Sequence, residues 1–192
     1  MGQRLNLEIW SDGKCLANAY YHWSAYTSCA SVLVNEVIQA YRSNPVAPTK
    51  LVAVRLLEAT GAGLPYEEKA AMQAEYPDAS FAECFGRNNG LIAVTNQAIN
   101  ETRYWEEYRA TIHLDRQSVE FFVLRQIPVA EWRKYVEDDE LNEELLDVNS
   151  LPQMQYDASK IPFDDFQAFS GMFDQNDVFY CHKTNTVIDS IE

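Results

Sequence analysis

The sequence lacks the cysteine spacings typical of metal sites and of the disulfide frameworks of small secreted domains. It has four cysteines, and no two of them form a C-x-x-C pair; they are Cys15, Cys29, Cys84 and Cys181. The N-terminal segment also lacks the basic stretch followed by an apolar stretch that marks a secretory signal. We therefore expect reduced thiols and an intracellular protein.

Long apolar runs are also missing, and basic residues are few. No stretch approaches the 18 apolar residues that a membrane-spanning helix needs. The chain has 15 basic and 29 acidic side chains, which gives a net charge of −14. A field of this sign repels phosphate groups, so we expect neither direct nucleic-acid binding nor docking on an anionic membrane. It favours a basic protein partner.

The shortage of basic residues is greatest in the last third of the chain. Residues 1–130 hold 11 basic and 14 acidic side chains, whereas residues 131–192 hold 4 and 15. The densest stretch, YVEDDELNEELLD at 135–147, has seven acidic side chains and no basic one. On a helix, Glu137, Glu140 and Glu144 would lie along one side, with leucines on another. Such a row of carboxylates can imitate successive phosphates. The alternative is a solvated helix face or a flexible tail that keeps the protein soluble.

The rest of the sequence is rich enough in apolar residues to fold. Apolar residues make up 47% and aromatic residues 12% of the 192 positions, which is sufficient for one domain with a core. Alternation of apolar and polar residues predicts hairpins over 5–10 with 15–23, 110–115 with 119–126, and 178–181 with 186–191, and a short strand over 91–94. Helical periodicity and capping residues predict helices from Ser24 or Thr27 to about Arg42, over 49–59, 65–75 and 95–107, from Pro128 into the acidic run, and from Pro162.

These elements predict an α+β fold with one mostly antiparallel sheet, built from hairpins and covered by helices, and an acidic helical C-terminal third. Residues 1–127 would form the core domain. Residues 128–192 would form an acidic C-terminal region of helices plus a closing hairpin, and whether it packs on the same core stays open. Residues 149–161 read as a linker or loop. The aromatic side chains Phe166, Phe169 and Phe173 belong either to the core or to an interface, and core packing is favoured.

Two groups of residues suggest chemistry, but each has a simpler structural interpretation. His22 precedes Ser24, Thr27, Ser28 and Cys29 at a strand-to-helix junction, so a base lies near three kinds of nucleophile. The nucleophilic mechanism also needs a group that orients the base, and no aspartate follows at a recognisable spacing. Helix capping by Ser24 or Thr27, and packing of Cys29 in the helix's apolar stripe, explain the same residues.

A zinc site is the second possibility. The pair Cys181-His182 could be joined by Cys15, Cys84 or His22, but zinc sites usually need two close pairs. Isolated buried cysteines account for these residues more simply. We expect no metal and no cofactor.

Three stretches carry a resemblance to a known group of proteins. The sequences RLNLEIWSDGKCLANAYYHWSAYTS, RLLEATGAGL and RNNGLIAVTNQAINETRYWEE resemble small uncharacterised proteins encoded by phages and prophages of Gram-positive bacteria. The resemblance extends to about Leu124 and does not cover the acidic third. It implies an inhibitor of host enzymes that handle nucleic acid, including CRISPR nucleases.

The leading hypothesis is therefore a non-enzymatic, phage-derived inhibitor or binding protein in the host cytoplasm. It would bind a basic groove of a nucleic-acid-binding host enzyme, such as a CRISPR nuclease. Its role would be anti-CRISPR or another anti-defence action, and DNA mimicry is one way in which it could bind. The residues expected to bind this partner are Glu137, Asp138, Asp139, Glu140, Glu143, Glu144 and Asp147. Two alternatives remain, a small hydrolase that uses a Ser or Cys nucleophile near His22, and an acidic assembly protein that self-associates.

Overall fold

The computed structural model describes residues 3–24, 27–84, 90–122, 125–138 and 147–189, and only the backbone of residues 135–138. Its helices are α1 (Thr27–Ser43), α2 (Lys50–Glu58), α3 (Tyr66–Glu75), α4 (Asn96–Tyr104), α5 (Val129–Asp138), the short 3₁₀ helix η3 (Val148–Ser150) and α6 (Phe163–Met172). Its strands are β1 (Leu5–Ser11), β2 (Lys14–Tyr21), β3 (Leu91–Ala93), β4 (Tyr108–His113), β5 (Ser118–Phe122), β6 (Arg125–Pro128), β7 (Ile161–Pro162), β8 (Val178–Cys181) and β9 (Thr186–Asp189). The predicted α+β class is confirmed.

The larger sheet has six strands in the order β3-β2-β1-β4-β5-β7. Neighbouring strands are antiparallel except β1 and β4, which run parallel at the centre. Asp12 and Gly13 join β1 to β2 with φ values of 51° and 72°. Two consecutive positive φ values define the tight hairpin turn that matches the twist of the strands, so the predicted turn is confirmed.

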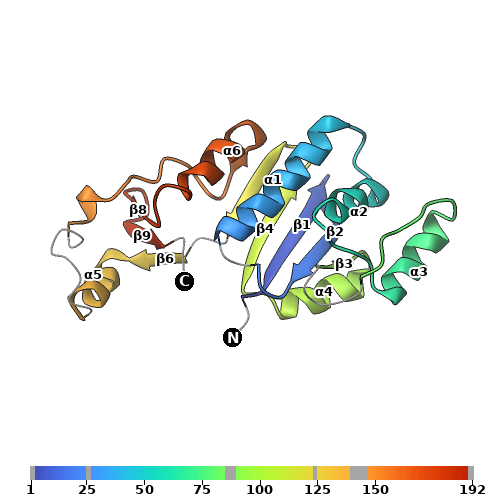
Figure 1. Ribbon diagram of the computed structural model, residues 1–192, viewed down its shortest axis with the longest axis horizontal. Coiled ribbons are helices and arrows are strands. Elements are labelled where there is room, and N and C mark those ends of the chain that lie inside the picture. The colour runs from blue at the N-terminus through green and yellow to red at the C-terminus, as the bar shows by residue number, and fades with distance from the viewer. Residues whose placement is uncertain (1–2, 25–26, 85–89, 123–124, 139–146, 190–192) are drawn as a thin grey trace.

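One face of this sheet is apolar and is covered by helices. Leu5, Leu7 and Ile9 point to this face and are fully buried in a cluster with residues of α1, α2 and α6. Figure 1 shows α1 crossing the sheet, with α2 on one side of it and α6 on the other. Because side chains alternate along a strand, Asn6, Glu8 and Trp10 point to the opposite face.

Helix α1 turns most of its predicted apolar stripe to the core: Ala30 and Val37 are buried, and Leu33 and Tyr41 pack against the core. Its buried residues are Thr27, Ala30, Ser31, Val34, Val37 and Ile38. Cys29, expected in the apolar stripe, is exposed, so that prediction was wrong. The helix has apolar residues on more than one side, since Val32 is also exposed, so periodicity alone could not determine how far the buried side extends.

The strands divide between two sheets, although one was expected. The predicted strand 119–126 is split into β5, in the large sheet, and β6, which pairs with β9 in a three-stranded sheet of order β6-β9-β8. The predicted loop 149–161 contains η3 and leads into β7, which pairs with β5. The fold class is unaffected by this division.

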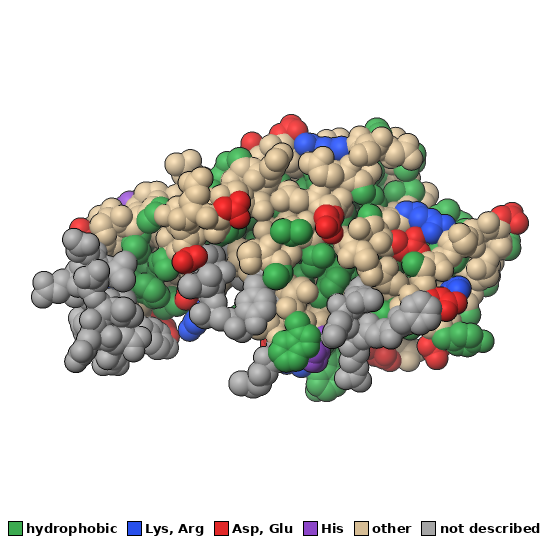
Figure 2. Space-filling model, viewed as in Figure 1, with side chains coloured by type: hydrophobic (Ala, Val, Ile, Leu, Met, Phe, Trp, Pro, Cys, Tyr) green, Lys and Arg blue, Asp and Glu red, His purple; other side chains and the backbone are tan. Residues whose placement is uncertain are grey.

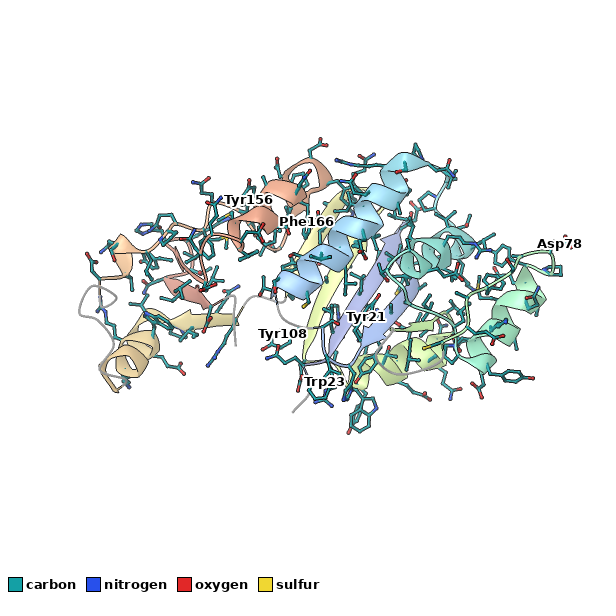
Figure 3. All side chains as sticks on the ribbon, viewed as in Figure 1. Tyr21, Trp23, Asp78, Tyr108, Tyr156 and Phe166 are labelled. Atoms are coloured by element: carbon teal, nitrogen blue, oxygen red, sulfur yellow. The ribbon has the colours of Figure 1, made fainter. Side chains whose placement is uncertain are left out.

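Aromatic side chains connect the C-terminal region to the main core. Phe166 and Phe169 are fully buried, and their ring centroids lie 5.6 and 5.4 Å from that of Phe121 on β5. Phe173 packs on Phe169 at 5.1 Å and on Phe179 at 5.6 Å. Core packing of the α6 phenylalanines, the favoured interpretation, is therefore what the structure shows (Figure 3).

Candidate functional site

The predicted partner-binding residues lie at the end of α5 and beyond it. Asp139, Glu140, Glu143 and Glu144 fall outside the described residues, and for Glu137 and Asp138 only the helical backbone is described. Asp147 is exposed and begins η3. Its Oδ1 atom accepts hydrogen bonds from the Asn149 backbone N–H at 3.0 Å and from Asn149 Nδ2 at 2.9 Å. Asp147 thus has a capping role in the fold itself.

Both C-terminal helices have acids in the first turn, Glu131 in α5 and Asp164 and Asp165 in α6, but α5 also has acids in its last turn. Helix α6 has Asp164 and Asp165 in its first turn, where the partial positive charge of a helix N-terminus favours carboxylates. Helix α5 ends with Glu137 and Asp138 and has no basic residue in its last turn. A helix C-terminus disfavours carboxylates, so the helix dipole gives no reason for Glu137 and Asp138.

The His22 junction does not bring a base to a nucleophile among the described residues. The Nδ1 atom of His22 lies 3.3 Å from the Tyr20 hydroxyl, and its ring meets the edge of Trp23 at a centroid distance of 5.0 Å. Thr27 is buried at the start of α1, whereas Cys29 is exposed. The contacts of His22 are therefore with aromatic neighbours, and they offer the hydrolase alternative no support.

The cysteines form no metal centre in the part of the chain that the structure describes. No group of three or more His, Cys, Asp or Glu side chains is placed to hold a metal ion among those residues. Burial, together with the nearby carboxylate of Glu8, raises the pKa of the Cys15 thiol to about 12. Cys15 is therefore protonated at neutral pH, and a protonated thiol is a poor nucleophile and a poor metal ligand.

A buried polar layer lies on the second face of the large sheet, beneath α4. Asn6, Glu8 and Asn18 are adjacent on β1 and β2 and have no solvent-exposed surface. The Glu8 Oε1 atom lies 2.6 Å from Arg103 Nε, and Glu8 Oε2 accepts a 2.6 Å hydrogen bond from the Trp10 indole. This hydrogen bond from Arg103 raises the pKa of the guanidinium further. The layer is thus held by a buried ion pair.

Several polar atoms of this layer and its edge have no hydrogen-bond partner among the described residues. They are the Oδ1 atoms of Asn6 and Asn18 and the Nε atom of Arg4. The amide nitrogens of both asparagines are used, because Asn6 donates to Glu106 and Asn18 donates to Thr102. Buried polar groups are normally paired with protein atoms or with water. These three atoms therefore have hydrogen-bonding capacity that the described residues do not use.

Beside this layer the structure has a cavity of about 620 Å³ between the sheet, α3 and α4. It is lined by Arg4, Tyr20, His22, Pro65, Glu68, Leu91, Ile92, Ala93, Ala98, Glu101, Thr102 and Trp105. Exposed aromatic side chains surround it, because Trp23 packs on His22 and Tyr104 packs on Trp105. Figure 2 shows hydrophobic side chains beside a histidine at the lower edge of the molecule, where Figure 3 labels Trp23.

No sequence motif indicates this cavity. Its residues come from the two ends of the β1-β2 hairpin, from α3, from β3 and from α4, which are separated by up to about a hundred positions. The one available signal was that Asn6, Glu8 and Asn18 are polar and lie on one face of strands whose other face is apolar. It predicted a solvent-facing side rather than a buried one.

Comparison with known proteins gives no further guide to the site: no protein-family model, no curated protein and no solved structure matches the chain. Within the described residues, none of the helices has both the length and the apolar character required to cross a membrane.

Proposed function

We propose that this protein is a non-enzymatic inhibitor, of phage origin, that binds a basic groove on a nucleic-acid-handling enzyme of the host cytoplasm. A CRISPR nuclease is the leading candidate partner. The observation that carries the proposal is the charge of residues 131–192, where 15 acidic side chains face only 4 basic ones. Whatever pairs form within this region, its four basic residues cannot neutralise fifteen acids.

Some of the acids in residues 131–192 have a role in the fold. Asp157 pairs with Lys183, Asp164 pairs with Arg42, and Asp147 caps η3. Glu137 and Asp138 stand instead at the helix end that disfavours them. Residues placed against local stability are often there for function. A basic partner would relieve the repulsion among them and would associate rapidly at low salt.

A nuclease-protection assay tests the proposal directly. The full chain is added to a guide-loaded CRISPR nuclease and, separately, to a restriction nuclease, and cleavage of target DNA is followed at low and moderate salt. We expect slower cleavage in at least one assay. The triple variant Asp138→Lys, Asp139→Lys, Glu140→Lys should lose this inhibition, because like charges would then face the basic groove.

The matched control reverses three exposed acids elsewhere on the chain: Glu36→Lys, Glu67→Lys and Asp78→Lys. It changes the net charge by the same amount and should inhibit as the natural protein does. Equal inhibition by the two triple variants would exclude the acidic segment as the binding surface, and uninhibited cleavage by both nucleases would refute the proposal. Light scattering at two salt concentrations separates it from the assembly alternative, which requires self-association.

A further inference from the structure

We propose that the cavity between β2, β3, α3 and α4 is a binding site for a neutral, planar nitrogen heterocycle of nucleobase or nucleoside size. This inference is independent of the acidic segment, because every lining residue lies between Arg4 and Trp105. The volume of about 620 Å³ is within the range of small-molecule sites, which is roughly 300–1,000 Å³.

The walls of the cavity suit a flat ring. Tyr20, His22 and Trp105 supply aromatic surface, while Leu91, Ala93 and Ala98 supply apolar surface. Trp105 ends α4 with 56% of its surface exposed, and Trp23, beside His22, is 51% exposed. Tryptophan is seldom left so accessible when it serves only the core, and an aromatic side chain in this position can stack on a base.

Polar groups at the cavity offer hydrogen bonds that the protein does not use. Arg4 Nε is a buried donor without a partner among the described residues, although the guanidinium reaches Glu107 through Nη2 at 2.9 Å. The hydroxyl of Thr102, a lining residue, donates to the Ile99 carbonyl and accepts a 2.8 Å hydrogen bond from Asn18; Asn18 lies behind the lining, and its Oδ1 has no described partner. A ligand with ring nitrogens or carbonyl oxygens, directly or through water, would satisfy such atoms.

The charges around the cavity exclude an anionic ligand. Glu68 and Glu101 are both in the lining, and Arg4, the one Lys or Arg among the described lining residues, is already paired with Glu107. The Glu68 carboxylate receives hydrogen bonds from the backbone N–H groups of Val94 and Thr95 at 2.5 and 2.8 Å, which hold it in place. Phosphate or carboxylate groups would meet this negative field, so the ligand is a base or nucleoside rather than a nucleotide.

The test is a calorimetric titration of the full chain with adenosine, guanosine and uridine, each up to millimolar concentration, and with adenosine monophosphate. We expect at least one nucleoside to bind, and adenosine monophosphate to bind more weakly than adenosine. Trp105→Ala should weaken binding by about tenfold, as base stacking requires. Arg4→Lys should also weaken it, because lysine keeps the charge toward Glu107 but lacks the Nε donor.

Tyr66→Ala is the matched control. Tyr66 is 83% exposed at the start of α3 and is not among the lining residues, so its loss should leave binding unchanged. Circular dichroism confirms that each variant is folded. Absence of binding by all three nucleosides would overturn the inference, as would unchanged affinity in Trp105→Ala. Tighter binding of the monophosphate would overturn the assignment of a neutral ligand. None of these outcomes bears on the inhibition assay.

Discussion

The two parts of the chain, residues 1–130 and 131–192, differ in how far their charges are balanced. In residues 3–122, several acids are paired with basic side chains: Glu8 with Arg103, Glu107 with Arg4 and Glu75 with Lys50 across the fold, and Glu106 with Arg109 locally. The net charge of residues 1–130 is only −3, from 11 basic and 14 acidic side chains. Residues 131–192, with 4 basic and 15 acidic, cannot balance their charge internally.

The difference separates charges that stabilise the protein from charges available to a partner. A pair such as Glu8 and Arg103 cannot be altered without a loss of stability, since removing either member leaves the other without its counter-charge. Exposed acids cost little to change and act at a distance. In the first part, the polar and charged groups of interest therefore lie inside, around the polar layer and the cavity. In the second part they lie on the outside.

The largest effect is expected from removing the buried carboxylate. Glu8→Ala would leave Arg103 and the nearby Arg109 without their shared partner, 2.6 and 3.8 Å away. Loss of one member of a buried pair typically costs about 3–5 kcal/mol. The lower figure applies here, because these arginine side chains are 28% and 36% exposed. Urea denaturation should show a loss of about 3 kcal/mol in the free energy of unfolding.

Glu107→Ala is the control for this change. Its pair with Arg4 has the same chemistry, but its side chain is 33% exposed, and such pairs contribute roughly 0–1 kcal/mol. The hydrogen bonds from Arg4 lower the pKa of Glu107, so the interaction is present at neutral pH. If the two substitutions cost the same, the polar layer does not hold the first part together.

A smaller effect is expected at alkaline pH, again from the first part. Burial raises the pKa of both Cys15 and Tyr21 to about 12. The unfolded chain releases these protons at lower pH, near 9 to 10, while the folded chain still holds them. Stability is therefore complete below about pH 9 and falls as the pH rises toward 12.

Cys15→Ala measures the contribution of the thiol. The natural protein should lose on the order of 2 kcal/mol more than this variant between pH 8.5 and pH 11, in urea titrations at each pH. The difference between the two proteins at pH 7 serves as the reference, because it contains the packing effect of the substitution alone. Parallel pH profiles would show that the thiol ionises as freely in the folded protein as in the unfolded chain.

What the sequence predicted well was local. The Asp12-Gly13 turn follows from residues that accept positive φ, and Thr95 accepts the expected capping hydrogen bond from Ala98. Such features depend on a few neighbouring residues. For the same reason the strands and helices were found close to their observed bounds, and with them the α+β class.

What the sequence missed depends on residues far apart. The parallel pairing of β1 with β4 joins Leu7 to Ala110, and the second sheet joins Ile127 to Val187. The burial of Asn6 and Glu8 results from the position of α4, which no alternation within β1 can indicate. The cavity combines five segments, so no single motif could reveal it. The predicted acidic site, by contrast, was a local feature of composition and remains a prediction.

The smallest expected effect concerns the ends of the two C-terminal helices. Neutralising Glu137 and Asp138 by substitution with Gln and Asn should raise the free energy of unfolding by at most about 0.5 kcal/mol, since carboxylates at a helix C-terminus oppose its dipole and their i,i+4 pairing with Arg133 and Lys134 is in the weaker order. Neutralising Asp164 and Asp165, in the first turn of α6, with Asn should lower it by about 0.5–1 kcal/mol, because these acids face a helix N-terminus and Asp164 pairs with Arg42.

Thermal unfolding of both double variants at low and high salt measures the two shifts, which should diminish together as salt screens the charges. The opposite signs matter more than the sizes, because the variants remove the same charge from the same region. A gain at α5 would mean that Glu137 and Asp138 are retained at a cost to folding, as expected for residues that meet a basic partner. A loss at α5 would give these acids a role in the fold, and the C-terminal region would then resemble the first part of the chain.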